Sequence, residues 1–278
     1  MERMTAAGTP YAQWNPQRAR IYLGPHRHPW VSYGILGLTV LVFVAQQASV
    51  WFLGRDWVAY WLMKWPAAYI VRREEWWRLW TAALVHANLL HIGFNMYALY
   101  LYGPLLEGLL GRGWFLVFYL TAALWGNALS AVAASYPSLG ASTAVFGLFA
   151  GLWLLARQHE DVLGLWGARL RQTMWGLIAF NILYGVLMPN IDNWGHAGGA
   201  LGGLLFVLLA GPRWKLRPYP FEQLSEQEKA AFFLHRTMPL ELYSRRPWYW
   251  RLVGVAALWA LALGVVYWVG WRRVPGLF

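Results

Sequence analysis

The chain has 278 residues, of which 59% are apolar and only 13% are charged. A soluble domain carries roughly 25% charged residues, so this chain has too few of them to cover a surface that faces water. Its 21 Trp and 15 Tyr also indicate a membrane protein, because both side chains favour the membrane–water interface. The absence of cysteine excludes disulfides, thiol nucleophiles and thiolate metal sites.

The net charge of +11 is compatible with a nucleic acid partner, but in a membrane protein the distribution of Lys and Arg matters more than their total. We therefore expect membrane lipids, and no nucleic acid, among the partners. The segment before Val31 is polar and basic and lacks the short apolar core and cleavage site of a secretory signal. The first apolar run is expected to stay as a membrane span.

Seven apolar segments are predicted to cross the membrane, since about 20 apolar residues span a hydrocarbon core of about 30 Å. They cover 31–53, 79–106, two spans within 113–156, 172–188, 194–210 and 252–270. Residues 135–140 divide the long stretch, because this Ser-, Pro- and Gly-containing sequence is typical of a turn. The predicted fold class is an all-α polytopic membrane protein.

An odd number of spans places the two ends of the chain on opposite sides. With the N-terminus in the cytoplasm, sixteen Lys and Arg lie inside and seven outside, as the positive-inside rule requires. We therefore expect a multi-pass protein, in the plasma membrane, with 1–30 and the linker 211–251 in the cytoplasm. The tail 271–278 and a Trp-rich connection over 54–78 then lie outside. Within the linker, 223–236 has the pattern of a short amphipathic helix.

Three clusters of polar and small residues interrupt the predicted spans, and polar groups inside a membrane suggest function because they are costly to bury. The clusters are 86–95 in the second span, 140–147 at the start of the fourth and 195–203 in the sixth. His91 and Asn95, four residues apart, share one face of a helix.

Taken singly, these residues have structural explanations. A Ser at a helix start is usually an N-cap, a lone His in a membrane helix is as often structural as functional, and paired glycines usually serve close packing. Together they indicate more, because small faces on the fourth and sixth spans would bring Ser142 near His196. The helix from Ser142 to Ala156 is about 22 Å long, less than the core of about 30 Å. Ser142 would then lie below the outer boundary, beside a water-filled cavity.

In this order the clusters resemble the rhomboid intramembrane serine proteases. The resemblance covers residues 31–210 and includes Trp77-Arg78, and Glu107 between Gly103 and Gly111. It implies a six-helix rhomboid-like core over 31–210, followed by a C-terminal seventh transmembrane helix at 252–270. Trp77-Arg78, Glu107 and His86 are at positions that the resemblance marks as structural.

The resemblance implies a serine endopeptidase that acts on transmembrane protein substrates and needs no metal and no cofactor. Ser142 would be the nucleophile and His196 its base, a dyad without an acid. The side chains of His91 and Asn95, with the backbone amide of Ser142, would hold the oxyanion.

Three residues near the predicted dyad need separate interpretation. Thr143 stands where the family often has Gly, and Phe146 stands where an aromatic ring often packs on the catalytic His. If that aromatic is commonly Tyr, its hydroxyl is missing here. Neither change is expected to abolish activity. Asp192 precedes His196 by four residues and is expected to be an N-cap or loop residue rather than a third catalytic group.

The main alternative is a catalytically inactive rhomboid relative that binds membrane proteins for quality control. Such a protein would be expected to lack the Ser or the His, and both are present. A transporter would often have repeated halves, and an intramembrane metalloprotease would carry His-Glu-x-x-His, and neither pattern occurs in the sequence. Substrate cleavage with and without Ser142→Ala separates these functions.

Overall fold

The computed structural model describes residues 20–22, 28–188, 190–218, 222, 224–227, 229–230, 239–244 and 246–273. The chain divides into two compact units. The larger consists of His28–Gly211 and Trp248–Phe278, and the smaller consists of Met1–Arg27 and Pro212–Pro247.

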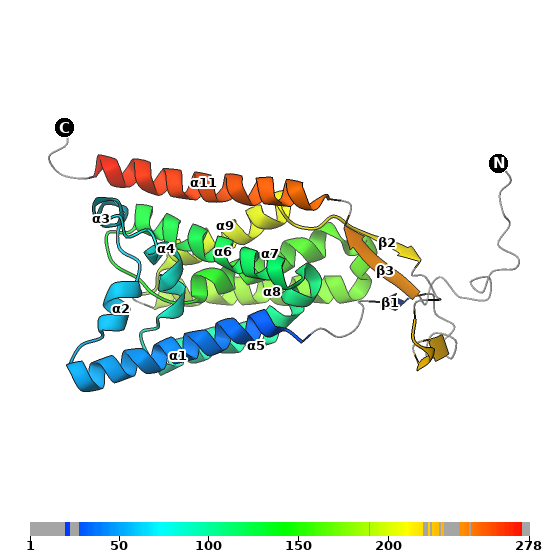
Figure 1. Cartoon of the computed structure of the whole chain (residues 1–278), viewed down its shortest axis with the longest axis horizontal. Coiled ribbons are helices and arrows are strands. Elements are labelled where there is room, and N and C mark those ends of the chain that lie inside the picture. The colour runs from blue at the N-terminus through cyan, green and yellow to red at the C-terminus, as the bar shows by residue number, and fades with distance from the viewer. Residues whose placement is uncertain are drawn as a thin grey trace, which may run out of the picture. The chain divides into compact units, whose positions relative to one another are not determined.

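The larger unit is a bundle of helices (Figure 1). Its long helices are α1 (Trp30–Leu53), α5 (Leu89–Leu110), α6 (Arg112–Ala133), α7 (Ser142–Gln158), α8 (Glu160–Leu187), α9 (Asn193–Leu209) and α11 (Trp248–Arg272). Within the described residues, α1, α6 and α11 are long and apolar enough to cross a membrane. The predicted all-α class is therefore confirmed for this unit, whereas the number of spans stays a prediction.

The Trp-rich connection after α1 folds into short helices, α2 (Trp57–Leu62), α3 (Ala67–Arg73) and α4 (Arg78–Thr81), followed by the 3-10 turn η3 (Ala82–Leu84). Arg78 holds this segment together and is fully buried. It forms an ion pair with Glu75, and its Nη1 donates to the carbonyls of Tyr60 and Met63 at 2.8 and 3.0 Å. The predicted structural role of Arg78 agrees with these contacts.

The predicted start of the second span at residue 79 is wrong. Residue Val85 is extended, with φ −102° and ψ 148°, and α5 begins only at Leu89. Asn88 caps this helix, because its side chain accepts a hydrogen bond from the backbone N–H of His91. Asn is among the strongest N-caps, so the helix does not extend backwards, and His86 lies in the irregular segment before it.

Two other helices begin earlier than the apolar pattern predicts. α8 begins at Glu160 rather than at 172, with a break at Gly164, and α11 begins at Trp248 rather than at 252. The predicted spans were limited to apolar runs and therefore end at charged residues, whereas the hydrogen bonds of a helix continue through charged residues. The remaining spans match the helices to within a few residues.

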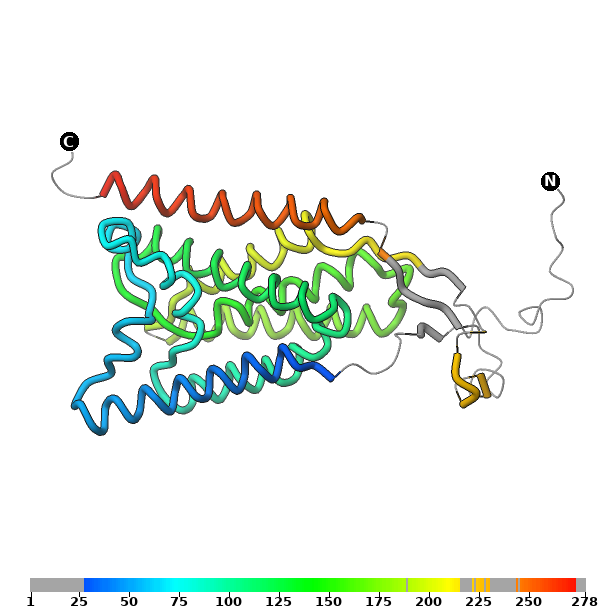
Figure 2. The backbone as a smooth tube through the Cα atoms, in the orientation of Figure 1, coloured from blue at the N-terminus to red at the C-terminus, as the bar shows by residue number. Residues whose placement is uncertain are grey.

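Along one side of the bundle, α1 and α5 run side by side (Figure 2). The Glu107 carboxylate on α5 accepts hydrogen bonds from the backbone N–H and the hydroxyl of Ser32, both at 2.7 Å. It therefore satisfies donors at the N-terminus of α1, which have no partner within the helix. The predicted structural role of Glu107 agrees with this contact.

Glycines bring α7 and α9 into backbone contact. A Cβ added to Gly199 would overlap the carbonyl oxygen of Thr143, and one added to Gly203 would overlap that of Gly147. From the first contact to the second, the residue number rises by four on both α7 and α9, so the two helices run parallel. Their N-terminal turns therefore lie at the same level.

The smaller unit contains a three-stranded sheet in the order β1-β3-β2. Its strands are β1 (Arg20–Tyr22), β2 (Trp214–Pro218) and β3 (Pro239–Ser244). β1 is parallel to β3, and β2 is antiparallel to it. Strands were not predicted in the N-terminal segment or in the linker, and the amphipathic helix predicted over 223–236 lies largely outside the described residues.

Candidate active site

Ser142 and His196 meet at the N-terminal ends of α7 and α9. The Ser142 Oγ and the His196 Nε2 are 2.9 Å apart, a hydrogen-bond distance. Ser142 is the first residue of α7, but its side chain does not cap this helix. The hydroxyl is therefore available to the imidazole.

The ring of Phe146, one turn after Ser142, stacks on the His196 imidazole. The two centroids are 4.2 Å apart and the ring planes differ by 10°. This contact limits rotation of the imidazole and so favours the orientation in which Nε2 faces Ser142. Stacking uses the face of the aromatic ring, so it does not need the hydroxyl that a tyrosine would add.

Thr143 fills the space that glycines of the neighbouring helices leave open. A Cβ on Gly126 of α6 would lie 2.5 Å from the Thr143 Cβ, and one on Gly195 of α9 would lie 3.2 Å from its Cγ2. The β-branched side chain thus fits beside the dyad because α6 and α9 carry no side chain at these positions.

Asp192 is the N-cap of α9, as the sequence predicts. Its Oδ1 accepts from the backbone N–H of Gly195 at 2.9 Å. Its Oδ2 accepts from the hydroxyls of Ser130 and Ser138, each at 2.5 Å. The carboxylate therefore ties the end of α6 and the turn before α7 to the start of α9, while the His196 Nδ1 has no hydrogen-bond partner among the described residues.

Lys64 also supports the turn before Ser142. Its backbone exchanges hydrogen bonds with Ser138 at 2.9 and 3.0 Å, and its Nζ donates to the carbonyl of Tyr136 at 2.9 Å. The side chain is fully buried, and this burial lowers the pKa of Lys64 to about 8, although the nearby Asp192 carboxylate opposes the shift. The sequence did not single out Lys64, because one Lys in a connection with several basic residues carries no distinguishing signal.

His91 lies next to Ser142 across Gly140. A Cβ on Gly140 would lie 2.8 Å from the His91 Nε2 and 3.5 Å from the Ser142 Oγ, and the φ of Gly140 is +135°. Both the space and the backbone conformation therefore require glycine here. The His91 Nδ1 accepts from the backbone N–H of Ala87 at 3.4 Å, so in the neutral ring the proton is on Nε2, which faces Gly140.

Asn95 lies one turn after His91 on α5 and is buried. Its Nδ2 donates to the His91 carbonyl at 2.9 Å, and because an amide nitrogen carries two N–H groups, one donor remains for another acceptor. The backbone N–H of Ser142 is in the first turn of α7, where amides have no acceptor within the helix. These N–H groups are hydrogen-bond donors of the kind that an oxyanion accepts.

His86 orients the backbone just before Ser142. Its Nε2 accepts from the N–H of Ala141 at 3.2 Å, and its ring centroid is 5.0 Å from that of His91. The Gln46 side chain on α1 accepts from the His86 N–H at 2.9 Å and donates to its carbonyl at 3.1 Å. These contacts agree with the structural role predicted for His86, and the sequence did not single out Gln46 as its support.

Over the part of the chain that the structure describes, no cluster of three or more His, Asp or Glu side chains has an arrangement suited to a metal ion. The helices and the site together define a helical protein with a Ser–His pair between apolar helices.

Comparison with known proteins identifies the family. The family model described as the rhomboid domain matches residues 73–213, just over half of the chain, and the chain therefore belongs to the rhomboid family. With its long apolar helices, it is an integral membrane protein.

Relatives include proteins named as proteases. Rhomboid protease GluP of Bacillus subtilis is 34% identical over 142 residues, which are 51% of this chain and 27% of the relative. Putative rhomboid protease YdcA of the same species is 34% identical over 141 residues, 50% of this chain and 69% of the relative. RHOMBOID-like protein 1 of Arabidopsis thaliana is 32% identical over 153 residues, 52% of this chain and 38% of the relative. Two of these three relatives are named as proteases, and the chain spans between 27% and 69% of the length of these relatives.

Proposed function

We propose that this protein is an intramembrane serine endopeptidase that hydrolyses peptide bonds in or near transmembrane segments with a Ser142–His196 dyad. The observation that carries the proposal is the distance of 2.9 Å between the Ser142 Oγ and the His196 Nε2, at the start of two closely packed helices. The names of relatives such as rhomboid protease GluP support the same reaction.

The reaction follows from the chemistry of the pair. His196 Nε2 accepts the Ser142 proton while the Oγ attacks the substrate carbonyl carbon, which gives a tetrahedral oxyanion. When this intermediate collapses, the C–N bond breaks and His196 returns the proton to the leaving amine. A water molecule, deprotonated by the same imidazole, then hydrolyses the acyl-enzyme and restores the Ser142 hydroxyl.

The oxyanion would be held by donors on two sides of Ser142. The Ser142 amide is at the positive end of the α7 dipole, which favours negative charge. The His91 Nε2 and the remaining Asn95 N–H would complete the site. Donors fixed in a protein interior stabilise developing charge by several kcal/mol, since little reorganisation accompanies the reaction.

The substrates would be single-span membrane proteins. A membrane helix keeps its backbone in internal hydrogen bonds, so the bond to be cut becomes accessible only where the helix unwinds. Gly or Pro near the outer end of the substrate helix would favour this unwinding. The six-helix core with a seventh helix, the plasma membrane and the cytoplasmic N-terminus belong to the same proposal.

The decisive test is proteolysis of a transmembrane reporter by purified protein in liposomes. Ser142→Ala and His196→Ala are each expected to lower turnover at least about 1000-fold, because the two residues act as a unit. Thr173→Ala and His28→Ala, which change the same types of group on exposed positions, should keep wild-type turnover. Folding is checked by thermal unfolding of each variant.

A fluorophosphonate probe provides a second readout that needs no substrate. It should label Ser142, and the labelling should require His196. Folded Ser142→Ala protein that still cleaves the reporter contradicts the dyad. Wild-type protein that neither cleaves nor reacts with the probe is instead an inactive rhomboid relative.

A further inference from the structure

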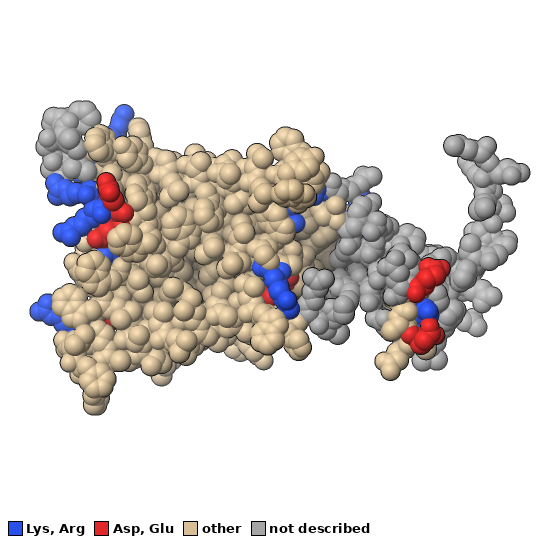
Figure 3. Space-filling model, in the orientation of Figure 1, with Lys and Arg blue, Asp and Glu red and all other residues tan. Residues whose placement is uncertain are grey.

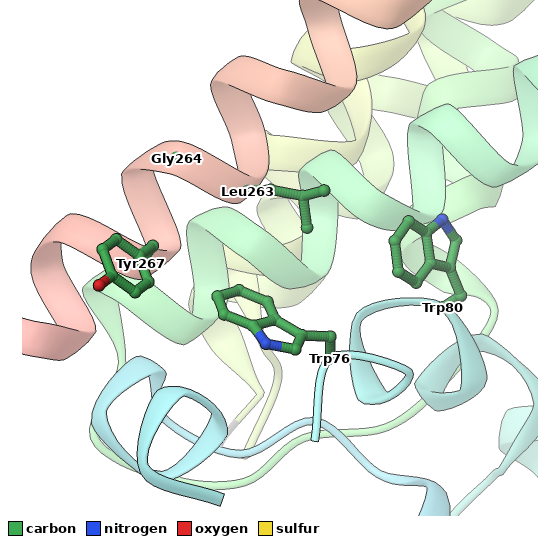
Figure 4. A pocket seen from close by; sticks show the side chains of 5 residues that line it. All are labelled: Trp76, Trp80, Leu263, Gly264 and Tyr267. Atoms are coloured by element: carbon green, nitrogen blue, oxygen red, sulfur yellow. The ribbon is translucent and has the colours of Figure 1, made fainter. Parts of the chain in front are cut away.

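An apolar groove runs along α11, lined by residues that do not contribute to the dyad or its supports. It has a volume of about 350 Å³ and is lined by Trp76, Trp80, Leu263, Gly264 and Tyr267 (Figure 4). Leu263, Gly264 and Tyr267 come from one face of α11, whereas Trp76 lies between α3 and α4 and Trp80 lies within α4.

The floor of the groove is well packed. The rings of Trp80 and Trp259 are 5.3 Å apart, and Trp76, Trp80 and Leu263 pack against a buried cluster that includes Ile70. Gly264 leaves the groove open, because a Cβ at this position would meet nothing within 4 Å. The groove is therefore a preformed, open slot rather than a packing defect.

One end of the groove is strongly basic. Arg72 and Arg73 end α3, Arg272 ends α11 and Arg273 follows it directly, and all four are exposed. The two helix ends lie together, since a Cβ on Gly270 would lie 2.5 Å from the Val71 Cγ2 and 2.6 Å from the Ala67 carbonyl. Figure 3 shows Lys and Arg side chains gathered at this end of the helices.

Acidic residues do not neutralise this arginine cluster, which consists of Arg72, Arg73, Arg272 and Arg273. Glu75 is buried and forms its ion pair with Arg78, so Glu74 is the exposed acid of the same segment. Four arginines with one exposed carboxylate leave a net positive charge.

The distance between the arginine cluster and the groove matches the distance between the charged headgroup of a lipid and its acyl chains. Tyr267 precedes Arg272 by five residues, which is about 7.5 Å along a helix at about 1.5 Å per residue. Trp268 and Trp271, both exposed, lie between the slot and the helix end, and Trp marks the membrane–water interface. The arginines are thus at headgroup level and the slot is at the level of the acyl chains.

We propose that this groove and the arginine cluster form a binding site for an anionic phospholipid from the surrounding bilayer. One acyl chain occupies the slot beside Gly264, and the phosphate and the negative headgroup contact the arginines. Charge complementarity selects the anionic lipid, because each basic residue near the surface favours an anionic headgroup. A zwitterionic lipid gains the apolar contact but not the full electrostatic one.

The test titrates the purified full-length protein with phosphatidylglycerol and, separately, with phosphatidylcholine of the same acyl chains, and native mass spectrometry measures the bound lipid. Wild-type protein should bind phosphatidylglycerol at least about 10-fold more tightly. Replacing Arg72 and Arg272 together by Gln should lower the affinity for phosphatidylglycerol by roughly 10- to 30-fold, and that for phosphatidylcholine by a smaller factor, because the choline cation offsets its phosphate. Arg55→Gln, which removes an exposed arginine outside the cluster, is the matched control.

The slot is tested by filling it. Gly264→Trp should weaken the binding of both lipids, whereas Gly34→Trp, at an exposed position on α1 that is equally open, should not. Equal affinity of wild-type protein for the two lipids, or equal losses in the two glycine variants, overturns the proposal. Thermal unfolding verifies folding, and if Gly264→Trp is unfolded, the paired arginine substitutions decide by themselves.

Discussion

His196 is oriented by a ring rather than by an acid. The nearest carboxylate, that of Asp192, is engaged by Gly195 and two serine hydroxyls, while Phe146 stacks on the imidazole. An acid that bonds the imidazole fixes both its tautomer and its orientation. A stacked ring fixes only the orientation, so the orientation of His196, the proposed base, depends on packing.

This dependence makes Phe146 a positioning residue with a measurable effect. Phe146→Leu keeps the apolar volume and loses the stacking, which is worth about 0.5–1.5 kcal/mol, so turnover should fall by about 2- to 10-fold. Phe146→Tyr keeps the ring and should keep turnover. The measurement is kcat and KM on a reporter, with the rate of fluorophosphonate labelling, and the KM should change little. An equal fall in both variants would show that ring stacking is not the cause.

Lys64 gives the protein a pH-dependent stability. Its pKa is about 8 in the folded protein, against 10.5 for an unperturbed lysine. Between these values the unfolded chain keeps the proton that the folded protein has lost, so stability increases with pH in this window. The full effect is on the order of 3 kcal/mol.

Lys64→Met removes the titrating group and tests this linkage. The unfolding free energy of the wild type, relative to Lys64→Met, should rise from pH 8 to pH 10.5 and stay constant below pH 8. Denaturant unfolding at each pH measures it, and Lys215→Met, which removes an exposed lysine, is the control. A difference that is independent of pH across this window would show that Lys64 titrates normally.

At the level of elements, the glycine contact between α7 and α9 places the dyad. Gly199 and Gly203 allow α9 to touch the backbone of α7 at Thr143 and Gly147, and the parallel direction puts both N-terminal turns at one level. Such small faces are a general means of helix association in membranes, where apolar surface alone gives little driving force. Here the same faces set the distance between Ser142 and His196, the proposed nucleophile and base.

Gly199→Ala should therefore affect activity as well as stability. The added methyl group overlaps the Thr143 carbonyl, and overpacking of this kind costs about 1–3 kcal/mol. Ser142 and His196 should separate, so labelling by fluorophosphonate should fall by at least about 10-fold. Gly176→Ala on α8, where a Cβ meets nothing within 4 Å, should fold and react like the wild type. Unchanged labelling in folded Gly199→Ala protein would contradict the packing argument.

The sequence predicted most of the helices because each long apolar run is a local signal. It placed the end of the first span at Leu53, where α1 ends. It also placed a break at 135–140, which lies between the end of α6 and the start of α7. It missed the late start of α5, because the apolar pattern at 79–88 continues through a segment that Asn88 separates from the helix. It also missed the sheet, because β1 pairs with β3, whose residues are far away in the sequence.

The pairing of Ser142 with His196 was predicted from small-residue faces on two helices, and the structure brings these residues together. The supports Lys64 and Gln46 were not predicted. Their function depends on which loops meet around the turn before Ser142, and that meeting is a property of the tertiary fold rather than of any local pattern.

For the molecule as a whole, the direction of insertion decides on which side of the membrane the proposed active site opens. The bias of sixteen basic residues against seven predicts a cytoplasmic N-terminus. In that orientation the connection 54–78 and the ends of α3 and α11 face outside, with the arginine cluster in the outer leaflet.

Because the chain has no cysteine, single cysteines can report this orientation without a background. Glu74→Cys lies in the connection, and Glu226→Cys lies in the segment predicted to be a cytoplasmic linker, and both side chains are exposed. In intact cells a membrane-impermeant maleimide should label the cysteine at position 74, whereas the one at position 226 should react only after permeabilisation. The reversed result would show that the protein is inserted in the opposite direction. Labelling of both from outside would mean that an even number of spans separates the two positions, which contradicts the predicted arrangement of five spans between them.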